Sequence, residues 1–189
     1  MRIIGWARLA AATTLLALAA CAGSSGGTII TAGGTWQDFH APGGDFAVSL
    51  PEMPKPGRDT TAKDGSVNRS YYVEESACVY MVGYSSSPTR RGASLDRWLD
   101  STRDALSTRL GGKLRGERRF ALGDSRAVEF VLEVPGSGTS GGYTIRGRIY
   151  VKHAGAGKDM LYQTLVTGKP GIDKAAETTR FLESFRFVG

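Results

Sequence analysis

The chain has 189 residues, of which 41% are hydrophobic and 22% charged, and its formal net charge is +6 at neutral pH. Its 24 basic side chains are scattered among 18 acidic ones, as in the run RGERR, which argues against a nucleic-acid-binding surface. Two histidines and two cysteines, all far apart in the sequence, do not form a ligand set, so we expect no metal and no other cofactor.

The N-terminus has the organisation of a bacterial export signal. Arg2 and Arg8 precede or flank Leu9–Ala19, an apolar run without charge. This run of about 11 residues is shorter than the roughly 20 that a membrane span requires, and it matches the core of a signal peptide. We therefore expect a processed export signal here and not a transmembrane helix.

The end of this run resembles the lipobox of bacterial lipoproteins. Leu18–Cys21 is an apolar residue followed by two small residues and a cysteine. The resemblance implies cleavage before Cys21, lipidation of its thiol, and a mature protein held to the membrane by two or three acyl chains. Position 22 is alanine instead of the aspartate that retains enteric lipoproteins in the inner membrane, so we expect a periplasm-facing protein at the outer membrane. The alternative is an ordinary cleaved signal in which Cys21 is incidental.

Composition divides the chain into three parts. These are a lipoprotein signal peptide at 1–20, the lipidated cysteine with a flexible Gly/Ser/Thr-rich tether at 21–44, and a single globular domain at 45–189. A flexible tether of this length spans about 25 Å, which clears the lipid headgroups. Trp36 and Phe39 are unusual in a linker, and we expect them to pack on the edge of the domain.

The first half of the domain is predicted to hold three strands and a helix. Alternating apolar residues indicate a strand at 46–50, and two further strand-like runs follow at 67–75 and 78–86. A helix is predicted to begin after Ser94 and to end at Gly111. Its apolar residues share one stripe, which we interpret as a surface facing the core: Leu95, Trp98, Leu99, Leu106 and Leu110.

Cys78 is the second cysteine and lies in one of these strand-like runs. With Cys21 lipidated, Cys78 has no partner within the chain, so a disulfide framework is excluded. Its apolar neighbours predict a buried, unreactive side chain, and a reactive thiol is the alternative.

The second half of the domain is predicted to hold four strands and a closing helix. The strands are expected at 113–122, 126–134, 143–152 and 159–168, and the helix at 172–185. Links of hairpin length between these strands indicate a mainly antiparallel sheet with helices packed on its faces.

The glycine-rich segment 134–145 matches two functional patterns. It reads VPGSGTSGGYTI, which contains G-x-G-x-x-G and, around Ser140, G-x-S-x-G. A dinucleotide fingerprint and a nucleophile elbow both require a helix after the loop. The following residues, 143–152, alternate with a period of two and predict a strand. We therefore interpret the segment as a hairpin turn.

A specific register follows for this hairpin. It places Phe130 opposite Gly147, where the missing side chain leaves room for the ring. On the other face it places Glu129 opposite Arg148, which predicts a cross-strand ion pair. Coherent pairing on both faces supports a strand after the loop.

The domain resembles the PsbP-like domains, which include small DcrB-like bacterial envelope lipoproteins. The likeness lies in FAVSLPEMPKP, the long middle helix, the paired strands and the closing FLESFRF. It implies an α+β fold, in which an α/β/α sandwich surrounds a central, mainly antiparallel sheet. Relatives of this kind act mostly as accessory or binding modules, and none supplies a catalytic residue for this chain.

The preferred interpretation is a non-enzymatic, lipid-anchored cell-envelope protein that binds a protein partner. A basic strand carrying Arg146, Arg148 and Lys152 is a candidate surface for an acidic partner. The alternative for these residues is a face covered by a helix or solvated, with cross-strand ion pairs.

Two other functions remain open. One is the binding of a small ligand or glycan in a cleft lined by tyrosines: Tyr71, Tyr72, Tyr80, Tyr84 and Tyr150. The other is a serine hydrolase that uses Ser140. A triad would need a histidine, and the chain has only His40 in the tether and His153 in a turn-like segment.

Overall fold

The computed structural model describes residues 35–63, 65–89, 94–136, 141–155 and 157–188. The expected signal peptide, Cys21 and Ser140 lie outside these residues. None of the helices within the described ranges combines the length and the apolar character that crossing a membrane requires.

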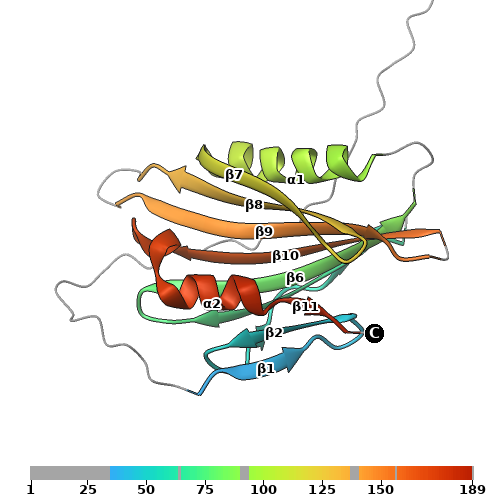
Figure 1. Ribbon diagram of the computed structural model, residues 1–189, viewed down its shortest axis with the longest axis horizontal. Helices are drawn as coiled ribbons and strands as arrows, with labels where there is room; N and C mark the ends of the chain where they lie inside the picture. The colour runs from blue at the N-terminus through green and yellow to red at the C-terminus, as the bar shows by residue number, and fades with distance from the viewer. Residues whose placement is uncertain (1–34, 64, 90–93, 137–140, 156, 189) are drawn as a thin grey trace, which may run out of the picture.

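A large antiparallel sheet forms the centre of the molecule (Figure 1). Its strands, in spatial order, are β3 (Lys55–Pro56), β5 (Val67–Glu74), β6 (Cys78–Pro88), β10 (Lys158–Gly168), β9 (Tyr143–His153), β8 (Ser125–Val134) and β7 (Lys113–Leu122). The short strand β4 (Thr60–Thr61) also pairs with β5.

The two faces of this sheet are covered differently. On one face α1 (Leu95–Leu110) packs on β8 and β9. On the other face lie α2 (Ala176–Ser184), the short 3-10 helix η1 (Ile172–Lys174) and a second sheet. That second sheet contains β1 (Gln37–His40), β2 (Phe46–Leu50) and β11 (Arg186–Phe187).

The expected α/β/α sandwich is therefore wrong. Most of the described residues are in strands, and α1 and α2 each cover only part of a face of the sheet instead of forming a helical layer. One physical reason is the small sheet, in which β1 and β11 pair with the two edges of β2. Phe46 and Val48 of β2 are buried against the large sheet, in the position that a helical layer would need. The antiparallel character of the sheet is confirmed.

The predictions for the middle helix and for the hairpin around the glycine-rich segment are confirmed. Helix α1 occupies the expected residues, and Gly111 ends it with a positive φ of 62°, a conformation that glycine adopts without strain. The β8–β9 hairpin has the expected register, with Phe130 opposite Gly147 and Glu129 opposite Arg148. The glycine-rich segment thus leads from strand to strand, as a turn does.

Three segments differ from the expectation. The closing helix is interrupted at Ala175, whose extended backbone (φ −64°, ψ 141°) separates η1 from α2. Arg186–Phe187 then forms β11, and Gln37–His40 forms β1 inside the expected tether. These strands are short and have no alternating pattern of apolar residues, so sequence periodicity does not predict them. They form because β2 lies between them and supplies their hydrogen-bond partners.

Each face of the large sheet has its own hydrophobic core. The core under α1 contains Leu99 and Leu106 packed on Phe130, Ile149 and Leu165. The core under α2 and the small sheet is rich in aromatic rings, and its members include Phe46, Tyr80, Tyr150, Tyr162, Phe181 and Phe185. Strands β8, β9 and β10 therefore contribute to a core on both faces.

Gly147 is expected to be intolerant of a side chain. A Cβ at this position would lie 2.3 Å from Leu165 Cδ2 and 3.1 Å from the tip of the Phe130 ring. We expect Gly147→Ala to lower the free energy of unfolding by about 1–3 kcal/mol through overpacking. Urea denaturation measures this loss. Gly116→Ala is the matched control, since its Cβ would meet nothing within 4 Å, and an equal loss in both variants would contradict the packing argument.

Candidate functional site

The basic strand expected to face a partner is covered by the C-terminal layer. Arg146 on β9 donates to Glu129 Oε1 at 2.7 Å and to the carbonyl oxygen of Asp173 at 2.8 Å. Arg148 donates to Glu129 Oε2 at 2.8 Å and to the carbonyl oxygen of Leu182 at 2.9 Å. Both guanidinium groups thus tie η1 and α2 to the sheet, and the covered, ion-paired alternative is the one observed.

Glu129 is shared by three guanidinium groups. Its side chain is only 12% exposed, and such burial by itself raises the pKa of a carboxyl group. The hydrogen bonds and charges of Arg118, Arg146 and Arg148 outweigh burial and lower the pKa of this carboxyl group to about 2. The carboxylate is therefore ionised at neutral pH and serves as the anchor of the C-terminal layer.

Lys152 also binds within the molecule. It pairs with Asp45, and its Nζ lies 4.2 Å from the centroid of the Phe187 ring. Burial alone raises the pKa of Asp45, but hydrogen bonds from Lys152 and Tyr162 outweigh it and leave the pKa below its usual value. This pair joins the segment before β2 to the large sheet.

Most of the tyrosines expected around a cleft are core residues. Phe39 packs on Tyr71 with ring centroids 4.8 Å apart, and Phe185 stacks on Tyr150 at 4.3 Å. Tyr72 alone among them is half exposed, because it points to the opposite face of β5. The buried members are Tyr71, Tyr80, Tyr84 and Tyr150.

The other candidate residues also have structural surroundings. His153 Nδ1 lies 2.6 Å from Asp159 Oδ1, which accepts a second hydrogen bond from the Thr89 hydroxyl at 2.8 Å. Cys78 is buried, and burial raises the pKa of its thiol, which disfavours a reactive thiolate. In the part of the chain that the structure describes, no group of three or more His, Cys, Asp or Glu side chains is arranged to hold a metal ion.

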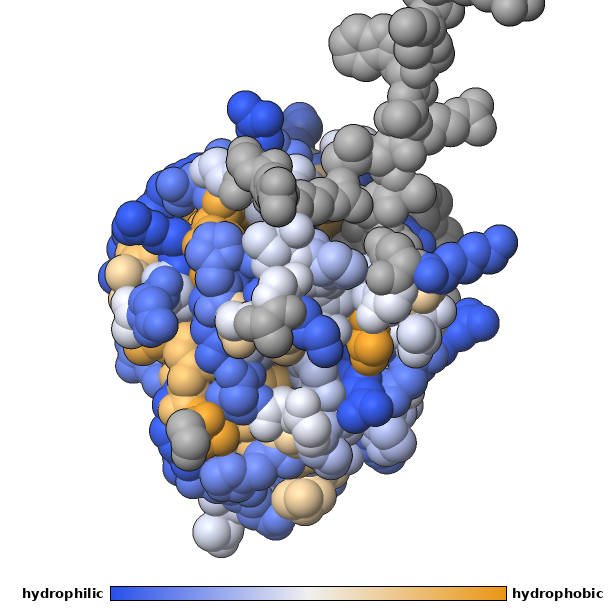
Figure 2. Space-filling view, turned by 90° about the vertical axis from the view of Figure 1, so that its right-hand side faces the viewer, coloured by the Kyte–Doolittle hydropathy of each residue, from blue (hydrophilic) through white to orange (hydrophobic). Residues whose placement is uncertain are grey.

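Exposed apolar residues do not point to a hydrophobic docking surface. The large hydrophobic side chains exposed in the described residues are Met53 (57%) and Leu114 (44%), which lie on separate segments. Figure 2 shows one end of the molecule, where hydrophilic atoms predominate and hydrophobic atoms form interrupted patches. A binding surface on the described residues is therefore expected to be polar.

One part of the large sheet has such a surface, and no helix of the described residues lies over it. On the α1 side, the helix lies along the β7–β9 part of the sheet, away from β5 and β6 (Figure 1). Most of the side chains that point to this side from β5, β6 and the neighbouring part of β10 are partly exposed. We call this surface the open face, and its residues are Asn68, Ser70, Tyr72, Met81, Gly83, Ser85 and Gln163.

Sheet register arranges the open face in rows across the strands. The central row is Ser70, Gly83 and Gln163. The Ser85 hydroxyl donates to Asn68 Oδ1 at 2.5 Å in the next row. A Cβ at Gly83 would lie 2.8 Å from the backbone oxygen of Arg69, so the floor of the open face stays flat at its centre.

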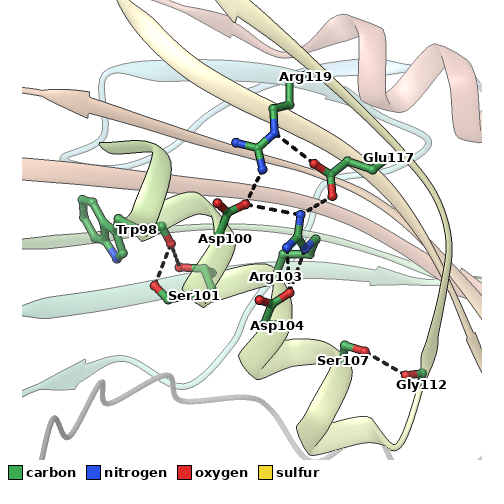
Figure 3. Close-up of polar contacts among 10 residues, drawn as sticks. Trp98, Asp100, Ser101, Arg103, Asp104, Ser107, Gly112, Glu117 and Arg119 are labelled. Carbon is green, nitrogen blue, oxygen red and sulfur yellow. Dashed lines mark hydrogen bonds and ion pairs between the residues drawn. The ribbon is translucent and has the colours of Figure 1, made fainter. Parts of the chain in front are cut away.

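A ring of charges fixes α1 beside the open face (Figure 3). Arg103 on the helix pairs with Glu117 on β7 and with Asp100 at 3.3 Å. Arg119 on β7 pairs with Asp100 and, at 3.0 Å, with Glu117. Since each of these four side chains contacts two others, α1 is held toward β7. The helix thus stays on the apolar part of the face.

Sequence reasoning singled out Tyr72 but missed Asn68, Ser70, Ser85 and Gln163. A signal was present, because polar residues alternate with buried ones along β5, which reads VNRSYYVE. The pattern does not show which polar residues of neighbouring strands share a face. That requires the pairing of β5, β6 and β10, and β10 follows the other two by some 70 residues in the chain.

Comparisons with known proteins show a shared fold. No protein-family model matches the chain, and no curated protein matches it. LpqN of Mycobacterium tuberculosis, a protein involved in cell envelope biogenesis, has a similar structure, with a TM-score of 0.54 and 12% identity over 82% of this chain and 91% of LpqN. A protein of unknown function from Pseudomonas aeruginosa, PA94, gives a TM-score of 0.45 and 11% identity over 77% of this chain and 91% of that one. The likeness to LpqN concerns the fold alone.

Replacing Glu129 is expected to destabilise the protein. In Glu129→Gln two buried guanidinium groups lose their counter-charge, which we expect to lower the free energy of unfolding by about 3 kcal/mol at neutral pH. The folded-state pKa of about 2 lies below the usual value of 4.5 for a glutamate, so this contribution is complete above about pH 4.5 and is lost as the pH falls toward 2.

Urea denaturation of both proteins between pH 2 and pH 7 measures this difference. The stability gap between wild type and Glu129→Gln should narrow as the pH falls. Glu133→Gln is the control, because Glu133 pairs with Arg115 at a site where both side chains are about half exposed. We expect a change below about 0.5 kcal/mol there. A pH-independent gap at Glu129 would show that charge pairing is not its cause.

Proposed function

We propose that this chain is a non-enzymatic, lipid-anchored binding module of the bacterial cell envelope. The observation that carries the proposal is the open face, a helix-free part of the sheet with half-exposed hydrogen-bonding side chains. The basic residues of β9, by contrast, form ion pairs within the molecule that hold its layers together. We infer that the open face, and not the basic strand, binds the partner.

Attachment to the envelope is supported by the lipobox-like sequence that ends at Cys21. The first described residues give the tether a fixed end, since the Trp36 ring packs on Tyr80 at 6.0 Å and lies 4.5 Å below the Arg180 guanidinium. The 14 residues from Cys21 to position 34 would span about 20 Å as a flexible chain. The domain would thus remain close to the membrane surface.

The compartment follows from the same features. A chain exported with Ala22 after the lipidated cysteine would face the periplasm, and the outer membrane is the preferred destination. The fold shared with LpqN supports an envelope role, because that protein is involved in cell envelope biogenesis. An accessory or partner-binding role, as opposed to catalysis, is supported by the strand-to-strand path of the segment that carries Ser140.

Lipidation at Cys21 is expected to determine membrane attachment. In a bacterial host with a lipoprotein pathway, the wild-type chain should label with radioactive palmitate and partition with membranes. Cys21→Ala should lose the label and leave the membrane fraction, because its anchor is absent. Cys78→Ala should behave like wild type, since Cys78 is buried in the domain. An unlabelled, freely soluble wild-type protein would contradict the anchor.

Binding at the open face is expected to be visible by photo-crosslinking in cells. A photoreactive residue at position 85, on the open face, should give a specific adduct. The same residue at position 101, on the exposed side of α1, should give none. Mass spectrometry of the adduct identifies whether a protein or a glycan is attached. Adducts at 101 alone, or at neither position, would contradict a binding role for this surface.

A further inference from the structure

We infer that the open face binds an uncharged, hydroxyl-rich ligand, namely a segment of neutral glycan. This inference rests on the proposed function, because it assumes that the open face is the binding surface. It adds the chemical class of the ligand, which follows from charge, hydrogen-bonding capacity and shape.

The centre of the open face carries no charge. Its side chains are amides, hydroxyls, a thioether and a phenol ring. At its borders Glu74 pairs with Lys55 at 4.0 Å, and Asp159 accepts hydrogen bonds from the Thr89 hydroxyl at 2.8 Å and from His153 Nδ1 at 2.6 Å. A charged ligand group covered at this centre would lose hydration without gaining a counter-charge, so the surface favours a neutral ligand.

The hydrogen-bonding groups of the open face can both donate and accept. This is true of the amides of Asn68 and Gln163 and of the Ser70 hydroxyl, and sugar hydroxyls have the same dual capacity. Within the described residues the Ser70 hydroxyl is buried without a hydrogen-bond partner, but it lies beneath the surface and a ligand does not reach it directly. The Gln163 amide is partly exposed and has no partner among those residues. A sugar hydroxyl can donate to this amide and accept from it, so such a ligand would be favoured.

Shape and aromatic character agree with a ring-shaped ligand. The Tyr72 ring is half exposed and has Met81 beside it on the next strand. An amphipathic tyrosine of this kind offers its apolar face to the C–H side of a sugar ring and its hydroxyl to a sugar oxygen. The flat centre at Gly83 lets a ring approach the sheet closely.

An extended polypeptide is a weaker match to these features. Its backbone N–H and C=O groups are normally satisfied by the edge of a sheet, where strand pairing supplies partners in sequence. The open face offers side-chain groups in the middle of a sheet, because β5, β6 and β10 already pair with one another.

The test is direct binding by the acylated full-length protein in detergent micelles, measured by isothermal titration calorimetry. The neutral probes are chitotetraose, cellotetraose, maltotetraose and mannotetraose. Their charged counterparts are the deacetylated chitosan tetramer and tetragalacturonate. We expect saturable binding of at least one neutral tetrasaccharide and at least tenfold weaker binding of both charged ones.

Variants locate this binding on the open face. Tyr72→Ala and Gln163→Ala should each weaken it at least tenfold. Tyr72→Phe, which keeps the ring, should weaken it less than Tyr72→Ala. Gln37→Ala, on the exposed side of β1, is the matched control and should bind as wild type does. Because Tyr72 and Gln163 are half exposed, all variants are expected to remain folded, which thermal unfolding checks.

The possible failures can be told apart. If no neutral tetrasaccharide binds at millimolar concentration, or if a charged one binds best, the glycan inference is overturned. The same holds if the adduct at position 85 contains only protein, although the proposed binding role of the open face would then remain. If neither sugars nor crosslinking reach the open face, both the inference and that binding role fail.

Discussion

The layered structure depends on the ion pairs that the largely buried carboxylate of Glu129 forms with Arg146 and Arg148. This carboxylate neutralises two guanidinium groups in the interior, and these groups donate to the carbonyl oxygens of Asp173 and Leu182. One side chain on β8 thereby fixes the positions of η1 and α2. In this position Phe181 packs on Tyr80 and Phe185 stacks on Tyr150 in the aromatic core. Without the carboxylate, the same arginines would be buried and uncompensated, which is strongly unfavourable.

This use of charge explains why the two faces of the large sheet have different roles. On the α2 side every strongly basic residue of β9 is used in holding a covering layer. On the other side α1 is held toward β7 by its own charge ring, so that its apolar stripe covers only part of the sheet. The rest remains a polar surface formed by β5, β6 and β10. The proposed binding surface is the part of the sheet that the described layers leave uncovered.

Local patterns predicted much of the fold and little of the candidate site. The bounds of α1 and the β8–β9 register could be predicted because period, helix-terminating glycine and facing residues are close in the chain. The cross-strand Glu129–Arg148 pair could be predicted for the same reason. The prediction of an α/β/α sandwich was wrong. Contacts between distant segments, such as β2 with β11, determine which elements cover a sheet, and local patterns do not reveal them. The open face was missed because β6, which pairs with β5, also pairs with β10 from the far end of the chain.

By itself, the sequence determined the order of the main strands and helices, the antiparallel hairpins and the presence of a strand after the glycine-rich segment. These depend on residues within one hairpin or one helical stripe, where spacing alone sets the geometry. Only the tertiary structure decided that Arg146 and Arg148 of β9 pair with Glu129 beneath the C-terminal layer, and that small polar residues of three strands share one surface that no described helix covers. The reason is that the alternation of apolar and polar residues shows which side chains share one side of a strand. Whether that side is core or surface depends on the packing of layers that are distant in the sequence.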